Sequence, residues 1–389
     1  MNNSEYNQYS KNFEIDKKME DKIVATLRNN DLSWPFGATK ELERNISRFL
    51  NVKYALAHCN GTSAMYAAMF AAGVGRNTEV ICPTYTFWAS IAPAVNLGAR
   101  VIFCDINKDD LLIDTSSVEK NITSKTKAII APHLWGRLCN IDKLKKICNR
   151  HNRKIYIIED SSHCFGAKYK DKFLGTLGDV GIFSLQAGKP LIAGEGGMLV
   201  TDNFEIYDAA MYLGHYERIK LSSRTRYAGY SKTGGGYKFR IHPLASAIAI
   251  THLKGVKERL QRHNKLMLYY ESGLNGINQL QILKKPYKNF DYGGRFGLRA
   301  TLKIDSGRRS TFMKECNKKG LLIEEEYIPL LHRERFFLDH GAKKAGKNAF
   351  KETEKIHSSL ISLPIFYKGN NDIINIYVRD LGNLLKKYN

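Results

Sequence analysis

The sequence predicts an α/β protein with a large domain built on a three-layer, mainly parallel sheet and a smaller α+β domain at the C-terminal end. Three observations support this prediction. Short apolar runs alternate with longer amphipathic stretches from Val52 to Asp202, which is typical of parallel strands covered by helices. The pattern changes after Gly236, where a long helical stretch leads into fewer strand-like segments. The chain of 389 residues can also hold two or three core-forming units, at roughly 150 residues per domain.

The large domain is predicted to contain seven strands with helices between several of them. The strands are expected at residues 54–57, 80–83, 101–104, 128–131, 155–158, 180–184 and 198–201. The helices are expected at residues 62–73, 86–97, 116–121 and 141–152. In parallel sheets of this kind, ligands bind beyond the carboxyl ends of the strands. Reactive side chains are therefore sought in the loops that follow the strands.

The C-terminal part of the chain is predicted to have a different architecture. A helical segment runs from residue 243 to about residue 270. It leads into strand-like pieces at residues 296–304 and 321–324, and a final helix is expected at residues 372–387. Before this part, residues 168–175 are typical of a surface hairpin. We therefore expect an N-terminal arm at residues 1–30, a large domain at 31–255 and a small domain at 256–389.

The charge balance is strongly basic, with 60 lysines and arginines against 38 aspartates and glutamates, a net charge of +22. Such an excess attracts polyanions, so nucleic acid is a candidate partner. The basic residues do not form one tract, however, and modest clusters near Lys145, Arg259 and Lys344 are typical of solvated faces. Since no DNA-reading motif is evident, we predict no nucleic-acid partner. An anionic substrate is equally compatible with the charge.

The cysteines and the apolar runs bear on compartment and metal binding. Seven cysteines are scattered without a CxxC pair, which predicts reduced thiols and no metal site. No apolar run reaches the roughly 20 residues needed to cross a bilayer. Residues 1–18 lack the basic head and apolar centre of a signal peptide. We therefore expect a cytoplasmic protein with no membrane partner.

The stretch with the most chemical information is residues 178–203, GDVGIFSLQAGKPLIAGEGGMLVTDN. Lys189 follows a predicted strand that ends at Ser184, in a loop dense with small residues. Glycine lets the backbone approach a bound group closely, and a lysine can form an imine with an aldehyde cofactor, as in pyridoxal-phosphate (PLP) enzymes. Alone, Lys189 is also compatible with an ordinary exposed lysine. The segments described next favour the cofactor interpretation.

A second segment, IIEDSSHCFG at residues 157–166, places polar groups at the end of another predicted strand. A carboxylate at Asp160 would keep a pyridine nitrogen protonated and make the ring an electron sink. The opposite charge would in turn keep the acid ionised. His163 follows three residues later, near enough to hydrogen-bond a ring hydroxyl. A turn-capping role for Asp160 and an ordinary loop histidine at His163 are the alternatives.

Two further segments supply candidate cofactor contacts. In CNGTSA, residues 59–64, Gly61, Thr62 and Ser63 begin a predicted helix, and a helix N-terminus is a natural site for a phosphate. Ser184 can add another hydroxyl to this site. In PTYTFW, residues 83–88, Trp88 can stack on a planar cofactor. Helix capping and core packing are the alternatives for these residues.

Together these segments resemble the DegT/DnrJ/StrS aminotransferases, a branch of the fold-type I PLP enzymes that makes amino sugars and aminocyclitols. The match runs from about Leu32 to the C-terminus. It includes GYKFRIHPLASAIAITHL at residues 236–253 and ISLPIF at residues 361–366. The segment around Lys189 is very specific, and the others are moderately so. The resemblance implies that the large domain binds PLP.

The resemblance also implies roles for individual residues. Lys189 would bind the cofactor covalently and then shuttle the substrate proton, while Asp160 would pair with the pyridine nitrogen and His163 would lie beside the ring hydroxyl. Trp88 would stack on the ring. The phosphate would be held by Gly61, Thr62 and Ser184.

Enzymes of this family are dimers with shared active sites, so the resemblance implies a homodimer in which residues 236–240 come from the partner subunit. This chain has Lys238 where the family often has asparagine. A lysine can still meet the phosphate by charge. Pro190, directly after Lys189, is a smaller departure that stiffens the loop.

The reaction implied is the transfer of an amino group from glutamate or glutamine to a keto sugar, a nucleotide-linked keto sugar or a keto cyclitol. Some relatives carry histidine in place of the lysine and act as dehydratases, so Lys189 favours transamination. The alternatives are an aminotransferase acting on a small phosphorylated ketone, and a PLP-dependent dehydratase or lyase. A more distant alternative is a non-catalytic regulator that binds PLP or DNA.

Overall fold

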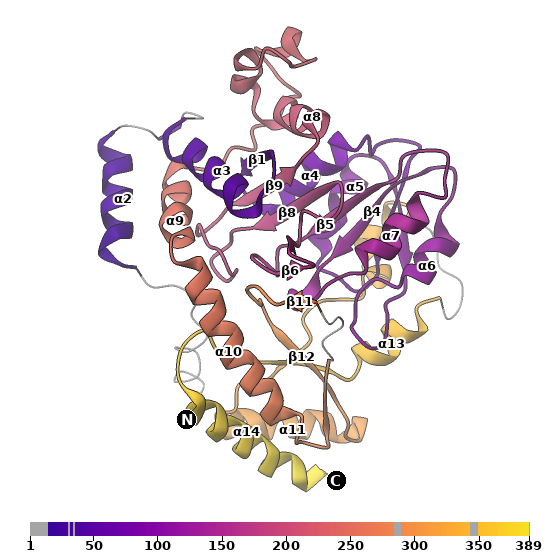
Figure 1. Cartoon of the computed structure of the whole chain (residues 1–389). Helices are drawn as coiled ribbons and strands as arrows, with labels where there is room; N and C mark the ends of the chain where they lie inside the picture. Colours follow the sequence, from indigo (N-terminus) through magenta and orange to yellow (C-terminus); the bar gives the residue numbers. More distant parts are fainter. Residues whose placement is uncertain (1–14, 30–31, 34–35, 284–288, 343–348, 389) are drawn as a thin grey trace.

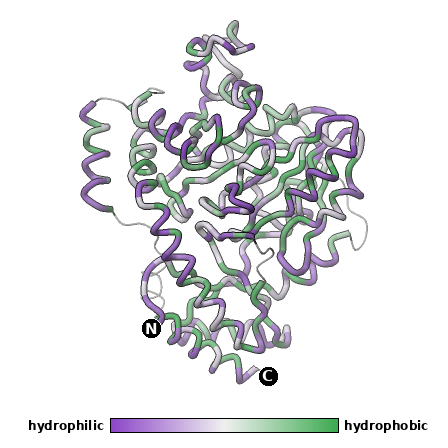
Figure 2. The backbone as a smooth tube through the Cα atoms, in the orientation of Figure 1, coloured by the Kyte–Doolittle hydropathy of each residue, from purple (hydrophilic) through white to green (hydrophobic). Residues whose placement is uncertain are grey.

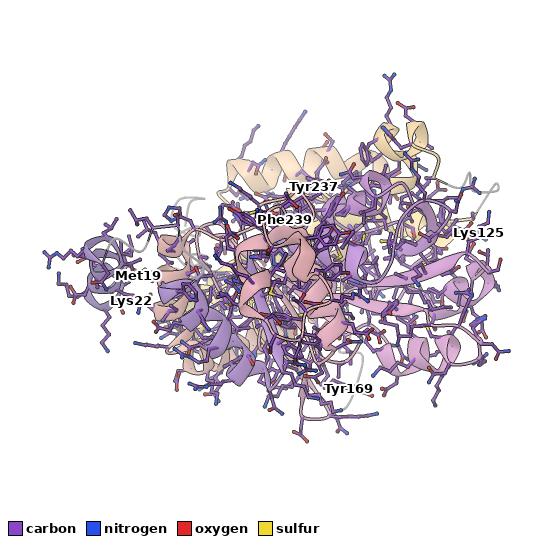
Figure 3. The ribbon with its side chains drawn as sticks, turned by 90° about the horizontal axis from the view of Figure 1, so that it is seen from above. Met19, Lys22, Lys125, Tyr169, Tyr237 and Phe239 are labelled. Carbon is purple, nitrogen blue, oxygen red and sulfur yellow. The ribbon has the colours of Figure 1, made fainter. Side chains whose placement is uncertain are left out.

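A computed structural model of the chain describes residues 15–29, 32–33, 36–283, 289–342 and 349–388. Half of the expected arm, residues 1–14 and 30, lies outside the described residues. The rest of it forms helix α2 (Lys17–Arg28), whose first turn is capped by the Asp16 side chain. The buried residues Met19 and Thr26 lie on α2, which contacts α9 (Pro243–Leu253). This helix lies at one edge of the molecule (Figures 1 and 3).

The central element is a seven-stranded sheet. Its strands, in spatial order, are β1 (Tyr54–His58), β9 (Gly197–Thr201), β8 (Val180–Ser184), β5 (Tyr156–Asp160), β4 (Thr126–Pro132), β2 (Glu79–Pro83) and β3 (Arg100–Cys104). The pairs from β8 to β3 are all parallel, whereas β9 is antiparallel to both β8 and β1. The mainly parallel sheet is confirmed, and all seven predicted strands are present.

Helices cover both faces of this sheet, because successive side chains of a strand point to opposite sides. In β2, Val80 and Cys82 join one buried cluster with α4 (Gly61–Ala71) and α8 (Phe204–Gly214), while Ile81 joins another with α7 (Ile141–Cys148). The central strands are accordingly hydrophobic along most of their length (Figure 2). The predicted three-layer arrangement is therefore confirmed. The remaining covering helices are α3 (Gly37–Leu50), α5 (Ala92–Asn96) and α6 (Thr115–Asn121).

Two expected helices are interrupted. The stretch at 86–97 forms a short 3-10 turn (Trp88–Ser90) and then α5, because Ile91 leaves the helical conformation with φ −132°. The long segment from residue 243 forms α9 and α10 (Val256–Leu274). Between them Gly255 has φ +103°, a conformation that other residues rarely adopt. The prediction of one continuous helix in each place is wrong for these reasons.

A second, antiparallel sheet follows in the C-terminal part, in the order β10 (Leu280–Ile282), β12 (Leu298–Leu302), β14 (Leu360–Leu363) and β13 (Glu324–Glu325). Its core is shared with α10, α11 (Arg309–Lys318) and α14 (Asn371–Leu385). The expected α+β arrangement is confirmed. The boundary that we propose at residue 255 stays a prediction.

Some C-terminal segments return to the large sheet. Phe337 of α12 (Arg335–Asp339) and Phe350 pack in the same buried cluster as Val80. Residues of α13 (Lys351–His357) bind Asp105, which accepts hydrogen bonds from the backbone N–H groups of Glu352 and Thr353. Two-residue strands β6 (Lys168–Tyr169), β7 (Lys172–Phe173) and β11 (Phe290–Asp291) form a small third sheet. The predicted hairpin at 168–175 therefore exists and also contacts the C-terminal part.

Two properties of the described residues bear on partners. No helix among them is both long enough and apolar enough to span a bilayer. No group of three or more histidine, cysteine, aspartate or glutamate side chains there is arranged to hold a metal ion. All seven cysteines are unpaired, and six of them are buried.

Candidate active site

A cavity of about 290 Å³ lies beyond the carboxyl ends of β4, β5 and β8. The strand ends contribute Pro132, Asp160 and Ser184, since parallel strands all finish at the same edge of the sheet. The N-terminus of α4 closes one side. Phe296 and Tyr327, from the C-terminal part, also line the cavity. The cavity therefore lies at the loops that follow the strands, which is where the sequence predicts the reactive side chains.

Six of the nine residues proposed from the sequence line this cavity: Gly61, Thr62, Asp160, His163, Ser184 and Lys189. They come from segments separated by more than a hundred positions in the chain. Ser63, Trp88 and Lys238 do not belong to the lining. The structure therefore brings together the proposed reactive groups and leaves three of the proposed binding groups outside.

Lys189 lies in a loop that is held at both ends. The loop leaves β8 at Ser184 and returns to β9 at Gly197, and these two residues pair across the sheet. Backbone hydrogen bonds from Leu185 to Gly196 (2.8 Å) and from Ala193 to Leu185 (2.7 Å) continue this closure. The loop that carries the lysine is consequently fixed to the sheet at both of its ends.

The amine of Lys189 is held in a largely apolar position. Its Nζ lies 3.5 Å from the centroid of the Phe296 ring. Burial lowers the pKa of the amine from 10.5 to about 8, although the negative charge of Asp160 opposes part of that shift. Because desolvation disfavours the charged form, a substantial fraction of the amine is neutral near physiological pH. A neutral amine is the form that attacks an aldehyde.

Asp160 ends β5 and is oriented by two donors. The hydroxyl of Ser90 donates to one carboxylate oxygen (2.6 Å), and the backbone N–H of Ser162 donates to the other (3.1 Å). Both serines also line the cavity. An oriented carboxylate in this place can bind a protonated ring nitrogen, since opposite charges at close range stabilise each other.

The neighbouring acid, Glu159, supports the floor of the cavity. It is fully buried and accepts hydrogen bonds from backbone N–H groups of Gly175 (3.0 Å) and Leu177 (2.7 Å). Its carboxylate also lies 2.8 Å from Nε2 of His133, whose Nδ1 accepts from the backbone of Cys139. Since Nδ1 is an acceptor, Nε2 of His133 carries the proton that it donates to Glu159. This pair fixes the ring of His133 in the cavity wall.

His163 is buried and neutral. Burial lowers the pKa of its imidazole well below the usual value, and the charges of Lys189 and Arg299 add to the effect. The backbone N–H of Trp135 donates to Nδ1 of His163 (3.3 Å). A neutral imidazole whose Nδ1 accepts a hydrogen bond carries its proton on Nε2. Nε2 is therefore a donor for a group in the cavity.

The N-terminus of α4 is built for a close approach to β8 and β9. Its N-cap, Asn60, accepts from the backbone of Ser63 (2.8 Å). A Cβ at Gly61 would lie 3.2 Å from Cβ of Ser184, and a Cβ at Gly197 would lie only 2.3 Å from the Asn60 carbonyl oxygen. Glycines at these two positions let the helix end meet the strands. The first backbone N–H groups of a helix have no partner inside it, so this end can bind an anion.

Of the three proposed contacts outside the lining, Ser63 and Trp88 are placed differently from the expectation, whereas Lys238 was expected to reach the site of the partner subunit. The hydroxyl of Ser63 donates to the Asn60 carbonyl (2.8 Å) within the cap, so it is already engaged there. Trp88 is 48% exposed, and its neighbour Phe87 lines the cavity instead. Lys238 is exposed, in a segment that also holds Tyr237 and Phe239 (Figure 3). The part of Trp88 and Lys238 in cofactor binding stays a prediction.

Several residues that line or support the cavity were missed from the sequence. Ser90, which donates to Asp160, lies in the 3-10 turn that interrupts the helix expected at 86–97. Trp135 follows β4, so the rule that sites lie after strands could have indicated it. Phe296 and Tyr327 come from the C-terminal part, where the sequence shows no motif that predicts such a role.

The chain matches the DegT/DnrJ/EryC1/StrS aminotransferase family over residues 14–378. The chain belongs to this family. An uncharacterized protein of Methanocaldococcus jannaschii is 30% identical to this aminotransferase over 94% of this chain and 93% of the relative. A GDP-perosamine synthase of Vibrio cholerae is 32% identical over 67% of this chain and 69% of the relative. The present chain is therefore a PLP-dependent aminotransferase, as the resemblance implied.

The fold is also that of solved relatives. The crystal structure of 3-amino-5-hydroxybenzoic acid synthase has a TM-score of 0.86 with this aminotransferase, at 22% identity, and covers 96% of this chain and 97% of that one. The residues in the cavity fit PLP by their chemistry. They provide a partly neutral amine, an oriented carboxylate, a neutral imidazole donor and a helix N-terminus on one cavity.

The lowered pKa of Lys189 predicts a distinctive pH dependence for its labelling. In the cofactor-free aminotransferase, acetylation of Lys189 by acetic anhydride should rise with pH and level off above about pH 8, because the neutral amine is then the main form. Peptide mass spectrometry would follow the reaction, with the exposed Lys257 of α10 as the reference in the same sample. A rate for Lys189 that keeps rising to pH 10 would contradict the assignment.

Proposed function

We propose that this aminotransferase takes its amino group from glutamate or glutamine and delivers it to a keto sugar, a nucleotide-linked keto sugar or a keto cyclitol. The observation that carries the proposal is the convergence of Lys189, Asp160 and His163 on one cavity beside the N-terminus of α4. The GDP-perosamine synthase and the 3-amino-5-hydroxybenzoic acid synthase among its relatives support amino-group transfer onto ring compounds.

We infer the residue roles from their positions. The N-terminus of α4, with Gly61, Thr62 and the hydroxyl of Ser184, would hold the cofactor phosphate. Asp160 would bind the pyridine nitrogen, and Nε2–H of His163 would donate to the hydroxyl oxygen attached to the ring. When bound, PLP supplies an aldehyde that takes up the donor's nitrogen and a ring that accepts electrons from the reacting carbon.

Lys189 would act as the base and acid of the reaction. With a pKa of about 8, its amine can both remove and return a proton near neutral pH, since catalytic groups work best with a pKa near the operating pH. The ring of Phe296 covers one side of this amine. Ser90 and Ser162 hold Asp160 in place while the proton moves.

Two alternatives receive less support. A small phosphorylated ketone is less favoured because the two named similar proteins are synthases of amino-substituted ring compounds. A dehydratase or lyase activity is less favoured because the position that relatives with that activity fill with histidine is a lysine here. Analysis of the products would separate these activities from amino-group transfer.

Replacement of the lysine tests the central assignment. Lys189→Ala should abolish amino-group transfer and the visible absorbance of lysine-bound PLP, because no other amine lies at that place in the described cavity lining. Absorbance spectroscopy and turnover with glutamate would measure both losses. Lys168→Ala, in the surface hairpin, is the control and should keep wild-type values. Full activity of Lys189→Ala would refute the role.

The two half-reactions can be measured separately. Glutamate or glutamine should convert the bound cofactor to its pyridoxamine form, with loss of the visible band, and a matching keto substrate should restore the band. A panel of one neutral keto cyclitol, one nucleotide-linked 4-keto hexose and dihydroxyacetone phosphate would identify the acceptor class. We expect one of the two ring compounds to react faster than the triose phosphate. Absence of a half-reaction with either amino acid would reject the proposed donors.

We also propose a homodimer with shared active sites. Aromatic side chains near the open cavity, Phe87 and Trp88, are exposed, as are Tyr230 and Tyr237 of the segment that projects after α8 (Figure 1). Tyrosine, tryptophan and phenylalanine are enriched at interfaces between protein chains.

The shared site gives a mixing test. Sedimentation should give twice the chain mass of 44.2 kDa. Lys238→Ala should be strongly impaired, and its mixture with Lys189→Ala should regain activity, because one site of each mixed dimer is then intact. A fully active Lys238→Ala variant would remove Lys238 from the site, and a monomer would refute the dimer.

A further inference from the structure

We propose that Trp135 is a positioning residue that sets the orientation and the proton position of His163, and that Arg299 and Glu326 hold Trp135 in place. The inference rests on the proposed hydrogen bond from His163 to the ring hydroxyl of the cofactor. It assigns a task to three buried residues that do not themselves touch the reacting atoms, and it connects the second sheet to the reactive cavity.

The first step is the backbone conformation of Trp135. This residue follows β4 and has φ +57° and ψ +26°, in the left-handed region, and Gly136 has φ +77°. A residue with a side chain rarely adopts such a conformation, because it is sterically strained. The conformation persists where surrounding contacts hold it, and strain of this kind gathers at functional sites. Here it directs the N–H of Trp135 to Nδ1 of His163.

The second step concerns what that N–H does to His163. A neutral imidazole has one donor nitrogen and one acceptor nitrogen, and the partner of one determines the other. Because Nδ1 accepts from Trp135, the proton is on Nε2. The alternative arrangement would place two N–H groups against each other and leave Nε2 unable to donate. The charged groups that act on this imidazole, Lys189 and Arg299, also keep it neutral.

The third step is the packing around the indole. Trp135 is 3% exposed. Its ring lies parallel to that of Phe296 (6.3 Å between centroids, 6°) and edge-on to that of Tyr327 (6.1 Å, 83°). A Cβ at Gly297 would approach Cε3 of the indole to 2.8 Å. The indole therefore has little room to move. Because the side chain is fixed, the backbone of Trp135 is held in its left-handed conformation.

The fourth step is the ion pair behind the indole. The guanidinium carbon of Arg299 lies 3.6 Å from the Trp135 ring, in cation–π contact. Arg299 is paired with Glu326, and the two side chains are only 2% and 1% exposed. It also donates to the hydroxyl of Ser362 (2.9 Å). Breaking a buried pair leaves an uncompensated charge, so the pair keeps Arg299 against the indole.

The role predicts that Trp135 acts through His163. In the PLP-loaded enzyme, the absorbance of the visible band can be titrated with pH. The midpoint of this titration should shift by about one pH unit when His163 loses its hydrogen bond to the ionised hydroxyl oxygen on the cofactor's ring. Trp135→Ala should move the midpoint in the same direction as His163→Ala, and the double variant should move it no further than His163→Ala does. Trp135→Phe, which keeps a planar ring against Phe296 and Arg299 and so holds the backbone in place, should restore most of the wild-type midpoint.

A second measurement needs no cofactor. In the protein labelled with ¹⁵N-histidine, the resonances of His163, assigned by their loss in His163→Ala, should show a protonated Nε2 alone; in Trp135→Ala they should show both proton positions. If Trp135→Ala does not fold, Glu326→Gln, which keeps the side-chain shape, should give the same changes to a smaller extent.

The outcomes separate the two proposals. A folded Trp135→Ala with the wild-type midpoint and a single proton position on His163 would overturn the inference. Fully additive shifts in the double variant would overturn it as well, because residues that act through one another are not additive. If instead His163→Ala leaves the midpoint unchanged, the proposed contact of His163 with the cofactor fails, while the ¹⁵N measurement still decides the role of Trp135.

Discussion

The parallel direction of β4, β5 and β8 is the constraint on which the site depends. Because these strands finish at one edge of the sheet, Pro132, Asp160 and Ser184 open onto the same cavity although they are far apart in the chain. The glycines at the start of α4 and β9 then let the helix end approach that edge. The strand direction and these glycines together bring the amine, the carboxylate, the imidazole and the anion-binding helix end to one place.

Most of the large sheet could be predicted from the sequence because its strands are short apolar runs separated by amphipathic helices, a strong periodic signal. All seven strands were expected within one or two residues of their observed bounds. The interruptions at Ile91 and Gly255 were not expected, because each depends on the backbone conformation of a single residue. The return of Phe337 to the large sheet depends on contacts between distant segments, which a local pattern does not contain.

The reactive groups of the site could be predicted because Lys189, Asp160 and His163 stand in dense motifs directly after strands. The residues around these groups could not be predicted, because it is the direction of a side chain that decides whether it faces the cavity. Ser63 and Trp88 occupy motif positions, yet the capping hydrogen bond and the 3-10 turn direct them elsewhere. Trp135 acts through a main-chain N–H and a left-handed φ, and neither property belongs to a residue type.

The loop that carries Lys189 is attached to β8 and β9 at both ends, and this has a consequence for repeated turnover. In each cycle the lysine would be released from the cofactor and must find it again. A side chain on a freely moving loop would lose search time and ordering entropy at every return. A loop fastened at Ser184 and Gly197 keeps the amine at a high effective concentration next to its target, so recapture behaves as an intramolecular event.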